Sequence, residues 1–127
     1  EDLKQAFLLV RLLEGTAGGE RYAGPRHFDA HAYRTEDDAG VWDFARGCMR
    51  TYKILAARAR EFDADPEVRA LVADQRDTVL EPLLRGYSRD KAARLRSFSF
   101  DATAHAQRGL RYERLDQLTI EHMLGVR

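Results

Sequence analysis

The sequence predicts a mainly α-helical fold with four or five helices and one short strand. Three observations predict this class. Apolar residues recur at helical spacing along most of the chain, capping residues mark several helix ends, and only one short segment is typical of a strand. The 127 residues are 44% hydrophobic and 33% charged, which is typical of one folded domain with a modest core.

The N-terminal third predicts one helix, one loop and one strand. A helix is expected over about residues 3–13, with Asp2 as its N-terminal cap. Apolar residues lie almost all round this helix, which predicts burial on more than one side. A glycine-rich loop over residues 15–25 follows. Residues 26–31 have a central aromatic side chain and lie between loop signals, so we expect a strand there.

The middle of the chain predicts two further helices. Apolar residues alternate in steps of four and three over about residues 41–62, which is the spacing of an amphipathic helix. Asp65 and Pro66 then start another helix, because an acid caps well and proline suits the first helical position. That helix is expected to continue through Val79, until proline and glycine interrupt it.

Two short helices are predicted near the C-terminus. Asp101 opens the first and Gly109 closes it, and the second runs from about Glu113 to Leu124 and ends at Gly125.

The lone strand poses a physical problem, because its backbone N–H and C=O groups need partners. The strand over residues 26–31 therefore pairs with another copy of the chain or belongs to a sheet whose remainder is absent. This mismatch indicates an incomplete unit.

Composition excludes several classes of function. The chain has 21 Lys and Arg against 21 Asp and Glu. This balance argues against nucleic acid and anionic membranes as partners, since both need clustered surplus cations. No run approaches the ~20 apolar residues of a membrane span. The single cysteine, Cys48, excludes an internal disulfide and suits the reducing cytoplasm, where we expect the protein.

The strongest candidate site is formed by His27, Asp29 and His31. On a strand these alternate residues project from one face, so two imidazoles and a carboxylate would converge. Such a half-shell suits a divalent transition metal such as Zn, Mn, Co or Ni, with further ligands from elsewhere. The alternative is a polar strand whose histidines form local hydrogen bonds.

The remaining candidates favour structural roles. Cys48 lies on the apolar seam of the long helix, where core packing is expected. His105 and His122 lie on predicted helices far from the strand, and the acidic run over residues 36–38 favours the N-terminus of the next helix. The glycines of residues 15–19 lack the lysine and the spacing of a phosphate-binding loop.

A series of motifs resembles xylose isomerase, in its actinobacterial form. The first is Gly24-Pro-Arg-His-Phe-Asp29, which continues to Thr35-Glu-Asp-Asp38 and Gly40-Val-Trp42. Others are Asp2-Leu-Lys-Gln-Ala-Phe7, Gly47-Cys-Met-Arg50, Ala64-Asp-Pro-Glu-Val68, Glu113-Arg-Leu-Asp-Gln-Leu118 and Glu121-His-Met-Leu-Gly125. They occur in the order of the C-terminal third of that family: helix seven, strand eight, helix eight and the tail.

The resemblance implies a metal-dependent aldose–ketose isomerase that interconverts D-xylose and D-xylulose, and glucose and fructose. The family uses two divalent cations (Mg, Mn or Co) inside a (β/α)8 barrel. Asp29 matches a metal-binding aspartate at the end of the eighth strand, and His27 matches a residue beside it. His31 replaces the usual lysine, which adds a potential ligand that could favour Zn, Co or Ni.

The chain is too short for a whole (β/α)8 barrel, which needs about 200 residues. We therefore expect a partial barrel completed by oligomerisation. Residues 1–63 would be the remnant of the last barrel units, and residues 64–127 a helical tail used for subunit contacts. The expected partners are further copies of the chain, as a homodimer or higher oligomer, and an aldose sugar.

Two alternatives remain open beside an isomerase rebuilt by self-association. One is a catalytically inactive truncated paralogue or fragment that acts as a helical oligomerisation module. The other is the complementing piece of a split barrel, with a second polypeptide supplying the first seven strands.

Overall fold

The chain folds into α-helices joined by loops, as a computed structural model describes for residues 2–16, 18–76 and 80–127. Within these ranges there are seven helices and no strand. The helices are α1 (Leu3–Leu13), α2 (Asp38–Ala64), α3 (Pro66–Asp74), α4 (Glu81–Leu84), α5 (Arg89–Arg96), α6 (Ala102–Gln107) and α7 (Tyr112–Leu124). The mainly α-helical class is confirmed.

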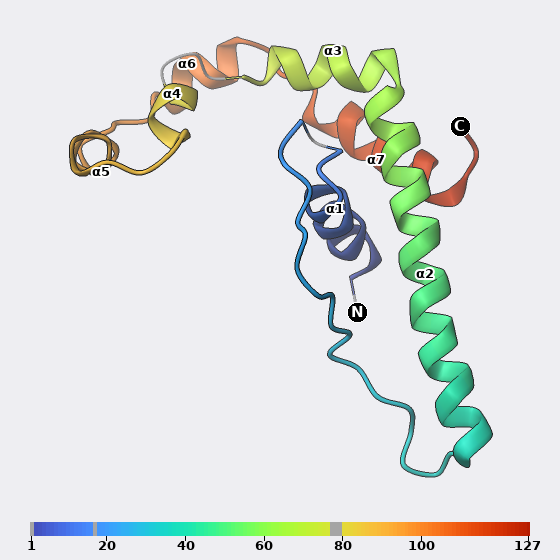
Figure 1. The fold of residues 1–127 in the computed structure, drawn as a ribbon. Helices are drawn as coiled ribbons and strands as arrows, with labels where there is room; N and C mark the ends of the chain where they lie inside the picture. Colours follow the sequence, from blue (N-terminus) through green and yellow to red (C-terminus); the bar gives the residue numbers. More distant parts are fainter. Residues whose placement is uncertain (1, 17, 77–79) are drawn as a thin grey trace.

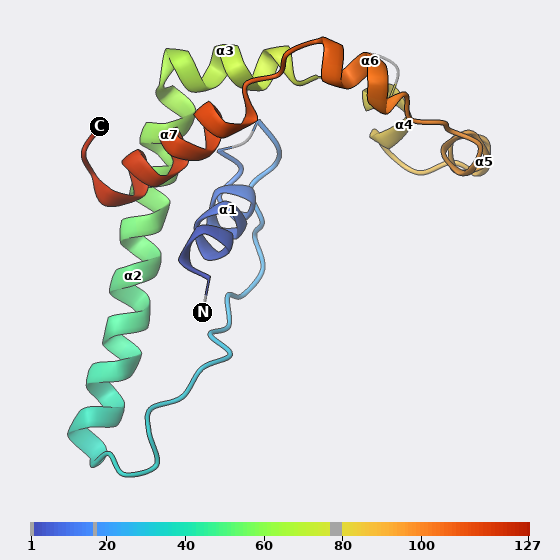
Figure 2. The same ribbon diagram turned by 180° about the vertical axis from the view of Figure 1, so that it is seen from behind.

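The helices form a bundle and an arm. The long helix α2 is the spine of the bundle, and α1, α3 and α7 each contact it. The arm carries α4, α5 and α6 away from the bundle beyond the end of α3 (Figures 1 and 2). Within the described residues α4 packs only against α5. Among the described residues, the buried apolar side chains of the bundle form one core.

The core lies where α1, α2, α3 and α7 meet. Phe7 and Phe62 are fully buried and touch edge to face, with ring centroids 5.7 Å apart. Edge-to-face contact is the favourable arrangement of two aromatic quadrupoles. The other buried apolar residues of this core are Val10, Leu55, Ala56, Ala59, Val68, Leu71 and Leu118.

Several predicted helix ends are confirmed. The Asp2 carboxylate accepts hydrogen bonds from the backbone N–H groups of Lys4 and Gln5 at the start of α1. Asp65 caps α3 in the same way, with Pro66 at its first position. Gly125 closes α7 with a φ of +70°, the left-handed conformation that glycine adopts without penalty.

Three expectations about secondary structure are wrong. Residues 26–31 form no strand, because no other described segment supplies the neighbouring edge that a strand needs. The number of helices exceeds four or five, since α4 and α5 form where the sequence indicated only an interruption. The helix from Pro66 ends at Asp74, and Val79 lies outside the described residues.

The expectation that α1 is buried on more than one side is also wrong. Phe7 and Val10 face the core, whereas most of the side chains on the remaining faces are exposed. The exposed leucines are Leu3, Leu8, Leu9 and Leu12. An apolar helix face left in water indicates a missing neighbour. This exposed face agrees with the expectation that the chain is part of a larger unit.

Candidate functional site

A cluster of three polar side chains anchors the loop that carries the candidate residues. Glu14 ends α1, Tyr52 lies on α2, and Arg26 lies in the loop between these helices. The Tyr52 hydroxyl donates to Glu14 Oε1 at 2.5 Å, and Arg26 Nη2 donates to the same oxygen at 2.9 Å. Arg26 Nε also donates to the Tyr52 hydroxyl. We call these three residues the clasp.

Two residues of the clasp, Glu14 and Arg26, carry opposite charges and are largely shielded from water. The Glu14 side chain is 8% exposed and that of Arg26 is 22% exposed. The hydrogen bond from Tyr52 and the charges of Arg21 and Arg26 outweigh burial, so the pKa of Glu14 is lowered. Burial and the bond to Glu14 raise the pKa of Tyr52. Both shifts favour a charged Glu14 beside a neutral phenol.

The clasp holds the chain on either side of His27. Arg26 is bound directly, and Phe28 packs edge to face against the Tyr52 ring, with centroids 6.2 Å apart. Beyond Phe28, Asp29 and His31 are exposed, and so is His27. These three side chains therefore lie at the surface of a loop that is fixed at its base.

His31 forms one local hydrogen bond, as the alternative to a metal site expects of these histidines. Its Nδ1 lies 2.9 Å from the carbonyl oxygen of Ala32. A hydrogen bond there requires the proton on Nδ1, which leaves the Nε2 lone pair as the metal-binding atom. Local bonding and metal binding are thus compatible for this histidine.

The donor set fits a divalent cation only in part. A carboxylate and imidazoles are suitable ligands for Mn, Co or Zn. Among the residues that the structure describes, however, no group of three or more His, Cys, Asp and Glu is placed to hold a metal ion. His27, Asp29 and His31 could therefore contribute to a site only if further ligands come from outside this part of the chain.

The other histidines and the cysteine have structural surroundings. His122 is buried, and its Nε2 lies 3.0 Å from the Asp65 carboxylate. His105 stacks on Phe100 with ring centroids 4.4 Å apart. Cys48 is half-buried on α2 and is not among the residues of the core, so the core packing expected of it is not found. In the acidic run, Asp37 caps α2 by accepting from the Gly40 N–H at 2.8 Å.

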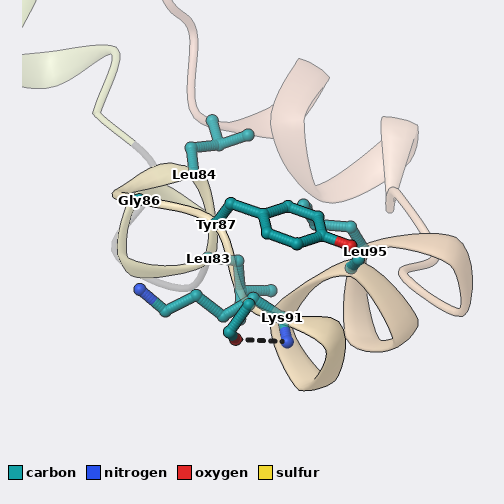
Figure 3. A pocket seen from close by; sticks show the side chains of 8 residues that line it. Leu83, Leu84, Gly86, Tyr87, Lys91 and Leu95 are labelled. Atoms are coloured by element: carbon teal, nitrogen blue, oxygen red, sulfur yellow. Dashed lines mark hydrogen bonds between the residues drawn. The ribbon is translucent and has the colours of Figure 1, made fainter.

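A shallow hollow of about 360 Å³ lies on the arm between α4 and α5. Its lining includes Leu83, Leu84, Tyr87 and Leu95 (Figure 3). The Lys91 ammonium group donates to the Arg85 carbonyl at its edge. The hollow is mostly apolar, and it lies on the arm rather than in the bundle that holds the clasp.

Comparison with known proteins identifies relatives over the whole chain. No family model matches it. The chain is 55% identical over 129 residues to the xylose isomerases of Thermus caldophilus and of Thermus thermophilus. It is 48% identical over 128 residues to the xylose isomerase of Streptomyces lividans. These matches cover 99–100% of the chain but only 31–32% of each relative.

The resemblance to xylose isomerase is confirmed. The chain spans about a third of the length of these relatives, which is consistent with a C-terminal fragment of a xylose isomerase barrel. The helical content and the exposed apolar face of α1 agree with such a fragment. No helix in the described residues is long and apolar enough to cross a membrane.

Sequence reasoning missed the clasp. Glu14 and Tyr52 lie 38 positions apart, and no spacing rule connects them. One signal was available: Tyr52 lies on the apolar seam of a helix, and a buried tyrosine hydroxyl needs a hydrogen-bond partner. That signal predicts a partner without saying which residue supplies it.

Proposed function

We propose that this chain forms the strand-eight and tail portion of a metal-dependent aldose–ketose isomerase that converts D-xylose to D-xylulose and glucose to fructose. The observation that carries the proposal is the similarity to xylose isomerases over the whole chain. On this similarity we propose Asp29 as a metal ligand, with His27 and His31 beside it. Mg, Mn or Co is the expected cation, and the two imidazoles could extend the choice to Zn or Ni.

A bound divalent cation would supply Lewis-acid polarisation of the sugar oxygens. The part of this chain is to offer the Asp29 carboxylate at the surface of a loop whose base is fixed by the clasp. The remaining ligands and the groups that orient the sugar would come from outside the described residues. Orientation supplies much of an enzyme's rate, so we expect efficient turnover only after the barrel is completed.

The test measures xylulose formation by the chelator-stripped chain with and without Mg²⁺, Mn²⁺ or Co²⁺. The chain is assayed alone and after mixing with the N-terminal two thirds of the Thermus caldophilus enzyme. We expect metal-dependent turnover in the mixture, reduced at least about 100-fold by Asp29→Asn, because even loss of a group that only supports a metal ligand costs about 10–100-fold. Asp43→Asn is the matched control, because Asp43 is 76% exposed in a surface pair with Arg46.

Two results would contradict the proposal. One is the absence of turnover in the mixture with every metal, which would favour an inactive paralogue or an oligomerisation module. The other is turnover that Asp29→Asn leaves unchanged. Metal-dependent turnover by the chain alone would instead support a site rebuilt by self-association.

We also propose that the arm makes contacts between copies of the chain in a homodimer or higher oligomer. Leu84 is 64% exposed and Tyr87 is 86% exposed beside the apolar hollow. Exposed apolar side chains of this size are typical of interaction surfaces. The assignment of residues 1–63 to the barrel and of residues 64–127 to subunit contacts stays a prediction, as does a cytoplasmic location.

Sedimentation velocity tests this contact. We expect the Leu84→Ser and Tyr87→Ser double variant to sediment as a smaller species than the wild type at the same concentration. Tyr33→Ser, which changes an equally exposed tyrosine on the loop, should leave the oligomer intact. An unchanged assembly in the double variant would contradict the proposal.

A further inference from the structure

We infer that Glu14, Arg26 and Tyr52 are positioning residues for Asp29. The clasp fixes the loop that carries this carboxylate and thereby determines where Asp29 meets a divalent cation. The inference rests on the proposed metal role of Asp29. Nothing in the comparisons or in the sequence motifs assigns such a role to Glu14 or Tyr52.

The clasp joins three separate parts of the chain. Glu14 Oε1 accepts from both Tyr52 and Arg26, and Arg26 also donates to the Tyr52 hydroxyl. The loop is thereby attached to the end of α1 and to the middle of α2 at one point. Arg26 also donates to the backbone carbonyls of Tyr22 and Gly24, at 3.0 and 3.2 Å, which fixes the loop immediately before the candidate residues.

Asp29 lies close to the clasp along the chain. Arg26 and Phe28 are both held by Tyr52, one by its hydroxyl and the other by its ring. Asp29 follows Phe28 directly, so its Cα lies about 3.8 Å from that of a residue held against α2. The Asp29 backbone is therefore held close to α2, and its exposed side chain extends from that point.

A polar cluster that is shielded from water contributes to the geometry of a fold as well as to its stability. Replacing such a cluster with well-packed apolar residues is often neutral for stability, because burying charges costs about as much as their attraction returns. Hydrogen bonds are directional, and each one restricts the distance and the angle between two groups. The clasp is therefore better explained by placement of the loop than by stability alone.

Limited trypsin digestion tests the clasp without any metal. Trypsin must take the arginine side chain into its own pocket, and the Arg26 side chain is engaged, whereas Arg34 in the same loop is exposed. We expect slower cleavage after Arg26 than after Arg34 in the wild type. Tyr52→Phe keeps the ring and removes the hydroxyl. The rate of cleavage after Arg26 divided by the rate after Arg34 should therefore rise about tenfold, as for loss of a hydrogen bond to a charged group.

Two further variants complete this comparison. Glu14→Gln should raise the same ratio, since it removes the carboxylate that both partners share. Tyr33→Phe removes a hydroxyl from an 83% exposed tyrosine of the loop and should leave the ratio unchanged. A ratio that stays within about twofold of wild type in both clasp variants would overturn the inference.

Mn²⁺ titration of the chain mixed with the N-terminal two thirds of the Thermus caldophilus enzyme, which would supply the further ligands, tests the link to Asp29 by proton NMR with only this chain labelled. In the wild type, Mn²⁺ should broaden the ring signals of His27 and His31 before those of buried His122. Tyr52→Phe should require several-fold more Mn²⁺ for the same broadening, and equal titrations would overturn the positioning role. Without selective broadening in the wild type, the metal role fails and the positioning with it. The trypsin ratio still reports on the clasp in that case.

Discussion

Replacing Asp65 with asparagine should remove the ionic contacts between the α2–α3 junction and the C-terminal segment that contains His122 and Arg127. Asp65 connects α2 to α3, and its carboxylate accepts from His122 at 3.0 Å and from Arg127 at 2.8 Å. It also caps α3 by accepting from the backbone N–H of Glu67 at 2.8 Å. Asparagine is an equally good N-cap. The substitution therefore keeps the cap and removes the charge.

The magnitude follows from the pKa of this carboxyl. Burial alone would raise that pKa, but the hydrogen bonds from His122 and from the α3 backbone, together with the charge of Arg127, lower it from 3.8 to about 2. Such a change corresponds to about 2 kcal/mol of folding stability. Because the pKa is lowered in the folded chain, this stability is present above about pH 4 and is lost as the pH falls towards 2.

Urea unfolding followed by far-UV circular dichroism measures the effect. We expect Asp65→Asn to lower the free energy of unfolding by about 2 kcal/mol at pH 7. The difference from wild type should shrink as the pH falls from 4 to 2, because protonated Asp65 carries no charge either. Asp43→Asn, in an exposed pair, should change stability by less than about 0.5 kcal/mol. A difference that is the same at pH 7 and at pH 2.5 would refute the reasoning.

Three further substitutions have separate outcomes. Phe62→Ala should lower the free energy of unfolding by about 3–5 kcal/mol in urea titrations, since it removes a 2% exposed ring that contacts Phe7 and His122; a loss below about 1 kcal/mol would contradict this core. Gly125→Ala should cost about 1 kcal/mol by the same measurement, because it places a side chain at a φ of +70° and against the Arg58 guanidinium group; an unchanged midpoint would be inconsistent with the left-handed cap. Asp29→Asn should leave the thermal midpoint in chelator-treated buffer within about 2 °C of wild type, since Asp29 is exposed; a larger fall would indicate a structural role.

Most of the helical segments and their ends could be predicted from local patterns in the amino-acid sequence. The Asp65–Pro66 start, the Gly125 stop and the long amphipathic helix all depend on contacts within a few residues along the chain. Such local contacts leave a readable pattern because helix geometry relates each residue to those three and four positions away. The xylose isomerase motifs were readable for the same reason, since each is a short contiguous run.

The errors arose where an element depends on distant neighbours. Residues 26–31 have the composition of a strand, but a strand needs an edge to pair with, and no described segment provides one. The apolar circumference of α1 predicted burial on several sides, but burial depends on what surrounds the helix, and this bundle covers only the side of Phe7 and Val10. Composition records the preference of a segment, whereas the rest of the molecule determines whether the preference is satisfied.

The surroundings of the candidate residues came from the three-dimensional fold alone. Their spacing singled out His27, Asp29 and His31, but their exposure on an unpaired loop depends on how the helices pack. The clasp became visible only when the end of α1, the loop and the middle of α2 were brought together. Hydrogen bonds between residues tens of positions apart depend on proximity in space, and no periodicity along the chain encodes it.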